Sequence, residues 1–335
     1  MSQPLSRLSI LAIGTELPPS VDIAQFAASK GARTDFYNSW KRVCHARDEN
    51  DQPSTLGSAA LAKALARSGV EPGSIKLVIF TGVSRDYVPS WSVATEVMKL
   101  NGISEDCVGI DITIGCLATL TALDFAMGFL MQRGGGHAAI VAAERWSYTV
   151  DHSDPDLAGM WVWADGGAAM VLGLDTGRPS LGDFVGAEFT SRSDYNGHVL
   201  IPYGGTRAPI APAGVNPYAR QVSSRPRGEV KQTYARNYRR TFDTLVKRFG
   251  VRGERLVCNQ ISPRTVGMIT ESLGYTPEQC VITGHDTGHL GAPDIIVGLD
   301  TLTRDGPRIS PLAFPVTLGA STAYAFGTGL VLPPA

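Results

Sequence analysis

Hydrophobic and polar positions along the first half of the chain alternate between two kinds of pattern. Short runs rich in Val, Ile and Ala are typical of strands, and longer runs with apolar residues three or four positions apart are typical of amphipathic helices. Strands alternating with helices indicate parallel β-α-β units. The predicted order is helix 55–68, strand 76–83, helix 91–100, strand 107–113, helix 116–133, strand 137–144 and strand 168–174.

The second half of the chain repeats this order. It predicts helix 230–249, strand 255–260, helix 263–273, strand 280–283, helix 290–304 and strands near 314–318 and 323–332. The halves share the order and lengths of their elements but no sequence identity. We therefore predict an α/β protein with five layers, α/β/α/β/α, built from duplicated halves at residues 1–175 and 176–335 that are related by a pseudo-twofold axis.

The composition is that of a folded, nearly neutral protein. Of 335 residues, 43% are hydrophobic and 18% are charged, and the formal net charge is −1. This balance argues against a disordered chain and against a globally basic nucleic-acid-binding protein. Residues 1–9 lack a signal-peptide pattern and no apolar run has the length of a membrane span, so we expect a cytoplasmic protein with no membrane partner.

One cysteine stands out by its position. The five cysteines are scattered along the chain: Cys44, Cys107, Cys116, Cys258 and Cys280. Without a C-x-x-C pair they indicate neither a disulfide framework nor a zinc site. Cys116 lies where a predicted strand gives way to a helix, and the free N–H groups of a helix start favour a thiolate and can hold an oxyanion. The alternative is a buried, inert cysteine.

The duplication gives Cys116 a partner. Cys116 opens the third helix of the first half, and His289 directly precedes the third helix of the second half. A pseudo-twofold axis would bring these two helix starts together. Asp294 follows His289 by five residues, so its carboxylate could orient the imidazole as in a nucleophile–base–acid triad; the alternative is that Asp294 only stabilises the helix start. His285 and His289 have the spacing of a metal pair, but the glycines beside them predict a turn, so we expect no metal site.

Three segments resemble ketoacyl-acyl-carrier-protein synthase III of the thiolase superfamily, and the likeness extends over essentially the whole chain. They are residues 111–116, 163–169 and 318–322. The resemblance implies the five-layered thiolase-like fold, a homodimer and an enzyme that loads an acyl group from coenzyme A or a carrier protein onto Cys116. It also implies that the backbone N–H groups of Cys116 and Ser321 form an oxyanion hole, and that no cofactor is tightly bound.

The chain departs from the family at two positions. Condensing enzymes of the family carry a His-Gln-Ala-Asn motif where this chain has Asn259-Gln260-Ile261-Ser262, and a Gly-Asn-Thr motif where it has Gly288-His289-Leu290. In those enzymes the His and Asn together stabilise the enolate formed by decarboxylation of a malonyl thioester. A cysteine, a histidine and an aspartate resemble instead an acyltransferase offshoot of natural-product pathways, in which a malonyl-type group is transferred to a sugar hydroxyl.

We therefore predict an acyltransferase that forms an ester. Cys116 would carry the acyl group, His289 would be the general base toward a hydroxyl of a natural product such as a polyketide glycoside, and Asp294 would orient the histidine. Asn259 and His198 are expected to contact the substrate. The alternatives are a starter-unit condensing enzyme that forms a carbon–carbon bond in polyketide or fatty-acid priming, and a catalytically silent partner subunit.

Positive charge is concentrated between residues 220 and 255, where eleven basic residues face three acidic ones. The helix within this segment predicts a surface that attracts the phosphates of coenzyme A or an acidic carrier protein. The expected contacts are Arg236, Arg239 and Arg240, together with Trp40, which falls near the place where members of the family stack the adenine. The alternative is a solvated helix face with its counter-charges elsewhere in space.

Overall fold

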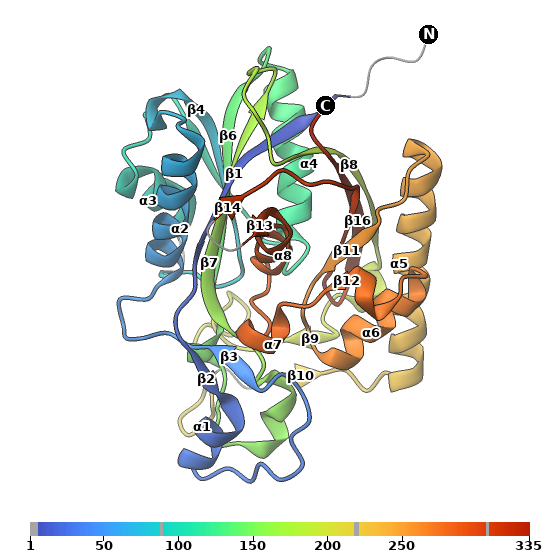
Figure 1. Ribbon diagram of the computed structural model, residues 1–335. Coiled ribbons are helices and arrows are strands. Elements are labelled where there is room, and N and C mark those ends of the chain that lie inside the picture. The colour runs from blue at the N-terminus through green and yellow to red at the C-terminus, as the bar shows by residue number, and fades with distance from the viewer. Residues whose placement is uncertain (1–5, 88–89, 218–220, 306–307) are drawn as a thin grey trace.

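The computed structural model describes residues 6–87, 90–217, 221–305 and 308–335 (Figure 1), so the basic residue Arg220 lies outside the described part. Two five-stranded sheets, one from each half of the chain, form its framework. The first has the strand order β5-β4-β6-β7-β1. Its strands are β1 (Leu8–Glu16), β4 (Ile75–Thr81), β5 (Val108–Ile112), β6 (Gly136–Arg145) and β7 (Asp165–Leu174).

The second sheet repeats the first strand for strand, in the order β12-β11-β15-β16-β8. In both sheets the first two neighbouring pairs are parallel and the last two are antiparallel. The strands of the second sheet are β8 (Gly182–Ser191), β11 (Arg255–Cys258), β12 (Cys280–Val281), β15 (Val316–Ser321) and β16 (Ala325–Leu332). The predicted division of the chain at residues 175 and 176 falls in the connection between β7 and β8.

A short antiparallel contact joins the two sheets into one sheet of ten strands. Residues 8–10 of β1 pair there with residues 182–184 of β8. Neither strand is predicted from the sequence. Most of β1 is buried and its sequence is almost continuously apolar, so it lacks the alternation that marks a half-exposed strand. β8 contains Gly182 and Gly186, residues that weaken a strand prediction.

Helices complete the five layers, and Figure 1 shows helices on both outer faces and between the two sheets. This arrangement confirms the predicted thiolase-like α/β/α/β/α fold. The outer pairs are α2 (Pro53–Ser68) with α3 (Val93–Leu100), and α5 (Arg227–Phe249) with α6 (Pro263–Ser272). The central pair is α4 (Ala118–Met131) and α8 (Asp294–Thr303), and each of these two helices contacts strands of both sheets.

The remaining elements decorate this framework. α1, β2 and β3 extend from its lower end in Figure 1. The short helices and strands are β2 (Ser20–Asp22), α1 (Ile23–Ser29), β3 (Arg42–Cys44), β9 (Val199–Leu200), β10 (Gln221–Val222), α7 (Gly284–Thr287), β13 (Arg304–Asp305) and β14 (Arg308–Ile309). The 3₁₀ turns are η1 (Pro72–Ser74), η2 (Trp146–Thr149), η3 (Pro155–Met160), η4 (Ser193–Tyr195) and η5 (Pro277–Gln279).

The two central helices begin later than predicted. α4 starts at Ala118 and not at residue 116, and α8 starts at Asp294 and not at residue 290. Cys116 and His289 therefore lie in the chain segments that lead into these helices, and not on a first helical turn. The side chains of both segments meet between the sheets, where the helices of the central layer start.

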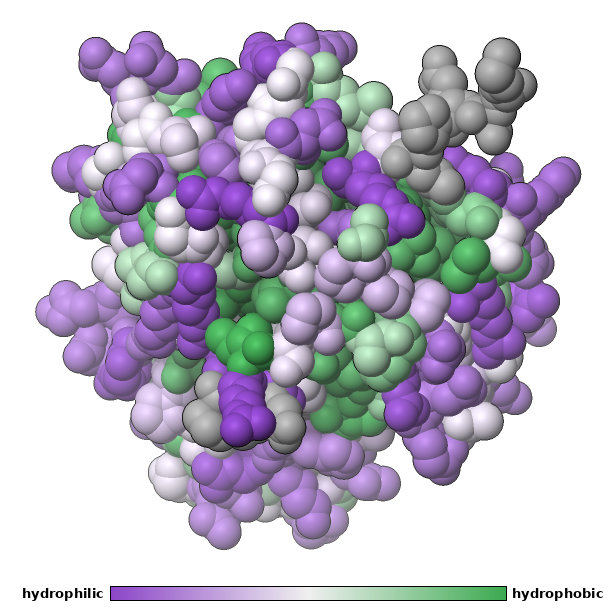
Figure 2. Space-filling model, turned by 45° about the horizontal axis from the view of Figure 1, so that its top comes forward, coloured by the Kyte–Doolittle hydropathy of each residue, from purple (hydrophilic) through white to green (hydrophobic). Residues whose placement is uncertain are grey.

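The surface mixes polar and apolar residues. Figure 2 shows one face on which hydrophilic residues occupy most of the rim and hydrophobic residues gather toward the middle. Within the described ranges, no helix combines the length and the apolar character needed to cross a bilayer.

Candidate active site

Cys116 lies in a tight turn between β5 and α4. Gly115 adopts a φ of +53°, and a Cβ there would come within 2.9 Å of Cγ2 of Thr322, so the turn requires glycine. The carbonyl of Gly115 accepts a hydrogen bond from the N–H of Ala118 at 3.0 Å. Cys116 is half-buried, whereas the other four cysteines are buried. Its thiol is therefore the most accessible of the five.

His289 lies in an irregular segment between α7 and α8 that is fixed by the first half of the chain. Its N–H donates to the carbonyl of Val162 at 2.7 Å, and its own carbonyl accepts from the N–H of Ala164 at 2.9 Å. Gly288 precedes it with a φ of +72°, and a Cβ at that position would meet the Val162 carbonyl at 2.7 Å. These contacts fix the backbone of His289.

The imidazole of His289 links a thiol to a carboxylate. Nε2 lies 3.4 Å from Sγ of Cys116, and Nδ1 lies 2.6 Å from Oδ2 of Asp294. Asp294 also accepts hydrogen bonds from the N–H groups of Leu290 at 2.9 Å and Gln260 at 2.7 Å. A carboxylate that receives three donors is an acceptor toward each of them. Nδ1 of His289 therefore carries a proton, and Nε2 faces the thiol.

Burial and charge act in opposite directions on His289, which is 4% exposed. Burial lowers its pKa, but the carboxylate of Asp294 and the negative charge of Cys116 raise the pKa to about 10. The imidazole is therefore protonated at neutral pH when the sulfur is a thiolate.

A second buried carboxylate, Glu144, lies against the same segment. A Cβ on Gly291 would come within 3.2 Å of Cγ of Glu144. Burial raises the pKa of Glu144 to about 7, although hydrogen bonds from Ser84 and from the N–H of Val83 oppose this shift. Glu144 is not predicted as a site residue, although a glutamate that closes the apolar strand β6 is a signal for a buried carboxylate.

Asn259 and Ser321 lie where the strands of the second half end, and they bond to each other. Oδ1 of Asn259 accepts a hydrogen bond from the N–H of Ser321 at 3.0 Å, and Nδ2 donates to the carbonyl of Gly291 at 3.2 Å. The Ser321 N–H, predicted as an oxyanion donor, is thus paired with a side chain in this structure. The carboxamide of Asn259, predicted to contact the substrate, is used by backbone groups instead.

Two other predicted site residues lie away from the triad. Nδ1 of His198 lies 2.5 Å from Oγ of Ser223, and none of the contacts found in the described ranges joins His198 to the triad. Trp40 is 3% exposed. Its indole N–H donates to the carbonyl of Gln260 at 2.6 Å, and its ring packs against Gly284. Trp40 therefore supports the Gln260 segment, where a cofactor-stacking side chain was expected.

His285 and His289, which are four residues apart in the sequence, contact different parts of the protein. The ring of His285 packs edge-on against Trp40 with 5.0 Å between ring centroids, whereas His289 faces Cys116. Within the part of the chain that the structure describes, no group of three or more His, Cys, Asp or Glu side chains is placed to hold a metal ion.

The arginines predicted to bind the donor lie on the solvent side of α5. The three exposed side chains are Arg236, Arg239 and Arg240. Arg239 is paired with Asp243 at 2.9 Å, and Arg248 on the same helix is paired with Glu188 at 3.0 Å. Part of the positive charge of this helix is therefore balanced by nearby carboxylates.

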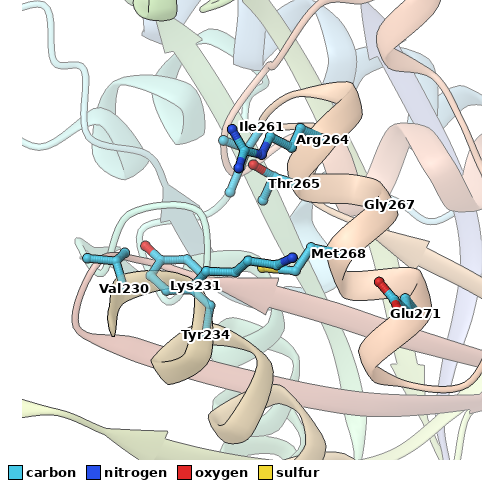
Figure 3. Close-up of a pocket in the computed structure, with 9 residues that line it drawn as sticks. All are labelled: Val230, Lys231, Tyr234, Ile261, Arg264, Thr265, Gly267, Met268 and Glu271. Atoms are coloured by element: carbon cyan, nitrogen blue, oxygen red, sulfur yellow. The ribbon is translucent and has the colours of Figure 1, made fainter. Parts of the chain in front are cut away.

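A pocket of about 480 Å³ opens between α5 and α6 (Figure 3). Figure 3 shows Lys231 on α5 and Arg264 on α6 reaching toward the space between the helices. Ile261, which lines the pocket, follows Asn259 by two residues, so the pocket lies beside the segment that leaves β11. The lining residues are Val230, Lys231, Tyr234, Ile261, Arg264, Thr265, Gly267, Met268 and Glu271.

The basic residue Arg264 is missing from the predicted site. Its only signal in the sequence is a positive charge in the first turn of the helix that follows Asn259 and Gln260. Gln260 is missing as well, although its backbone N–H holds the carboxylate of Asp294. Because every residue except proline has a backbone N–H, this contact could not be predicted from the residue type at position 260.

Comparison with known proteins agrees with this fold. The family described as 3-oxoacyl-[acyl-carrier-protein (ACP)] synthase III matches residues 110–192, which include Cys116. A beta-ketoacyl-[acyl-carrier-protein] synthase III of Streptomyces lividans is 27% identical over 298 residues, or 83% of this chain and 80% of that protein. A protein of the same name from Rhizorhabdus wittichii is 25% identical over 320 residues, or 92% of this chain and 93% of that protein.

Solved structures share the architecture. A variant of OleA from Xanthomonas campestris has a TM-score of 0.79 at 18% identity, over 98% of this chain and 99% of that chain. FabH, a 3-oxoacyl-(acyl carrier protein) synthase III from Xanthomonas oryzae, gives the same values. These likenesses show a common fold. The fold is thiolase-like, and the cysteine turn lies within the residues that match the synthase III family. In sequence, the chain is similar to 3-oxoacyl-[acyl-carrier-protein] synthase III over residues 110–192 and, at 25–27% identity, over most of its length.

Proposed function

We propose that this protein is an acyltransferase that carries its acyl group on Cys116 and passes it to a hydroxyl group, forming an ester. The observation that carries the proposal is the chain of contacts from Sγ of Cys116 to His289, at 3.4 Å, and on to Asp294, at 2.6 Å. This is the arrangement of a nucleophile, a general base and an orienting acid. The proposed acceptor is a natural product such as a polyketide glycoside, and the proposed assembly is a homodimer.

In the first half-reaction the thiolate of Cys116 attacks the carbonyl carbon of a thioester. The bond between that carbon and the donor sulfur breaks, and the departing sulfur takes the proton from Nε2 of His289. The products are an acyl-cysteine, a free donor thiol and a neutral imidazole. Acylation removes the negative charge of Cys116, and because that charge helps to raise the pKa of His289, the pKa falls once the acyl group is attached.

In the second half-reaction the neutral imidazole acts as a base. Nε2 of His289 takes the proton of the acceptor hydroxyl as its oxygen attacks the acyl carbon, and the bond from that carbon to Sγ of Cys116 breaks. The ester leaves, and the thiolate and imidazolium are restored. General-base catalysis of this kind contributes about 10²–10⁴-fold to a rate. The fall in the pKa of His289 thus suits its change from acid to base.

The pocket between α5 and α6 is the proposed entrance for the donor. Coenzyme A and the prosthetic arm of a carrier protein both present a thioester at the end of a long chain with phosphate groups. Lys231 and Arg264 supply positive charge at this pocket, and Ile261 of its lining follows Asn259 by two residues. Relatives named for acyl-carrier-protein substrates support a donor of this class. Arg236 and Arg240 remain predicted contacts of a carrier protein.

Carbon–carbon condensation is the second candidate, and the names of the relatives favour it. In that reaction the carbanion left by loss of CO₂ from a malonyl-type thioester would attack the acyl carbon on Cys116. The enolate needs hydrogen-bond donors. The carboxamide of Asn259, which stands where condensing enzymes carry histidine, is instead bonded to backbone at both ends. His289 with Asp294 forms a base, which proton removal from a hydroxyl requires.

Intact-mass spectrometry tests both candidates. Incubation with acetyl-CoA or malonyl-CoA should give an acyl adduct on the protein and none on Cys116→Ala, while Cys107→Ala, which alters a buried thiol, should still give it. A panel of glycosylated polyketides or a malonyl carrier protein is then added. A product that retains the whole acyl group supports esterification. A product that has lost CO₂ would establish condensation, and an absent adduct with every donor would contradict both.

A further inference from the structure

Asn259 is anchored in the sheet and buried at the centre of the site. Its backbone N–H donates to the carbonyl of Gly319 at 3.2 Å, which continues the pairing of β11 with β15 by one residue. Its side chain is 0% exposed. The carboxamide accepts from the N–H of Ser321 at 3.0 Å, donates to the carbonyl of Gly291 at 3.2 Å and approaches the carbonyl of Cys116 at 3.4 Å.

The three partners of this carboxamide belong to three segments that carry functional groups. Cys116 is the nucleophile on the turn before α4. Gly291 follows His289 by two residues in the segment before α8. Ser321 ends β15 and supplies the N–H predicted to bind an oxyanion. No pair of these segments is adjacent in the sequence, so a single side chain connects the parts of the site.

The chemistry of the carboxamide suits this task. It presents an acceptor at one end for an N–H group and a donor at the other end for carbonyl oxygens. An aspartate of nearly the same shape would turn an oxygen toward the carbonyls of Gly291 and Cys116, which repels both while it is ionised. An alanine would leave a buried N–H and a buried carbonyl without their partner, which is unfavourable for both groups.

We propose that Asn259 is a positioning residue that holds the Cys116 turn, the His289 segment and the Ser321 N–H in their relative places. This inference rests on the proposed function, because the groups that are held are those of the acyl transfer. It removes Asn259 from the set of substrate contacts. The two N–H groups of its carboxamide face the carbonyls of Gly291 and Cys116, so neither is left to donate to a substrate oxygen.

Alkylation of Cys116 by iodoacetamide measures this role without any acyl donor. In the full-length protein, Asn259→Ala should lower the alkylation rate at neutral pH by about tenfold, the size of one lost hydrogen bond, and change its pH profile. Asn237→Ala is the matched control, since Asn237 is also buried but donates to the carbonyl of Thr233 within α5. The control should match the parent protein. Thermal unfolding verifies that each variant is folded.

Asn259→Asp keeps the proposal testable if the alanine variant does not fold. Its alkylation rate relative to the parent should rise as the pH falls, because a protonated carboxyl group donates as the amide does. Unchanged rates and pH profiles in the folded variants would overturn the proposal. So would normal alkylation combined with a raised KM for the thioester, which is the result expected of a substrate contact. Failure of ester formation would refute the proposed function and leave these rates unaffected.

Discussion

The segments before α4 and α8 occupy corresponding places in the two halves, but they are built differently. The Cys116 turn is short, with a single left-handed glycine and a helix that begins two residues later. The His289 segment contains two left-handed glycines and is hydrogen-bonded to the first half of the chain before its helix begins at Asp294. The Cys116 turn has to place one sulfur atom, whereas the His289 segment has to orient an imidazole toward both Cys116 and Asp294.

The repeated sheets and the segments that connect their strands to the central helices therefore have different roles. The repeated sheets bring the two helix starts together, and this placement is the same whatever the residues on them do. The chemistry depends on the few residues between strand and helix. A thiol can be presented by one turn. An imidazole must have Nδ1 held by Asp294 and Nε2 held toward Cys116, which requires an ordered and longer segment.

Of the changes to these two segments, removal of the His289 imidazole should reduce activity most. We expect His289→Ala to lower acyl transfer to the hydroxyl acceptor by about 10²–10⁴-fold, because the general base is lost. Loading should fall less, so the acyl adduct on Cys116 should accumulate. Rapid quenching followed by intact-mass spectrometry gives both rates. His285→Ala is the control, since that ring packs on Trp40; equal transfer in all three proteins would refute the assignment of the base.

Removing the carboxylate should have a smaller effect that depends on pH. Asp294→Asn should reduce turnover by roughly 10–100-fold, as for other residues that orient a functional group. The carboxylate of Asp294 helps to raise the pKa of His289 to about 10, so this pKa falls in the variant. Loading is faster when the imidazolium can protonate the departing sulfur, so the fall in the loading rate at alkaline pH, expected near pH 10 in the parent protein, should move to lower pH in the variant.

The same substitution changes how stability depends on pH. A histidine whose pKa is raised by folding stabilises the folded state fully below its ordinary pKa of about 6.5, and this contribution is lost as the pH rises through the folded value of about 10. In Asp294→Asn the loss should occur at lower pH. Unfolding followed between pH 6 and pH 10 measures it. Asp300→Asn alters a carboxylate on the same helix that pairs with Arg304, and an equal shift in that variant would contradict the explanation.

The duplicated order of elements could be predicted because buried strands and amphipathic helices leave strong patterns. The patterns of β1 and β8, the strands that join the two sheets, are weaker. In β8, Gly182 and Gly186 lie where other groups come close: a Cβ at Gly182 would meet Leu312 at 2.8 Å, and one at Gly186 would meet Phe249 at 2.8 Å. The sequence contains these glycines but not the neighbours that make them necessary, so they indicate a break and not a strand.

The meeting of Cys116 with His289 and Asp294 could be predicted because it depends on the duplication and on one short spacing. The surroundings of the site could not. The pocket depends on the distance between α5 and α6, which no local pattern encodes. Trp40, expected to meet a cofactor, donates its N–H to the carbonyl of Gln260 and also lines a second pocket of about 630 Å³ beside α6, so its predicted role stays a prediction.

The smallest effect on activity is expected for substitutions at the pocket between α5 and α6, the proposed donor entrance. Lys231→Glu and Arg264→Glu should each raise the KM for the thioester donor, by about 3–10-fold at low salt and less at high salt, because they reverse a charge at a partly exposed pocket. Turnover at saturating donor should change little, because neither side chain contacts the triad among the described residues. Initial rates at two ionic strengths provide the measurement.

A matched substitution on the outer face of α5 identifies the kind of donor. Arg240→Glu changes an exposed charge on the outer face of this helix, whereas Lys231 lines the pocket. A small donor such as coenzyme A enters between α5 and α6 and should respond to Lys231→Glu alone. A carrier protein covers a wider surface and should respond to both. If neither variant alters the KM for either donor, the thioester enters elsewhere, because reversal of a charge beside an anionic donor must weaken its binding at low salt.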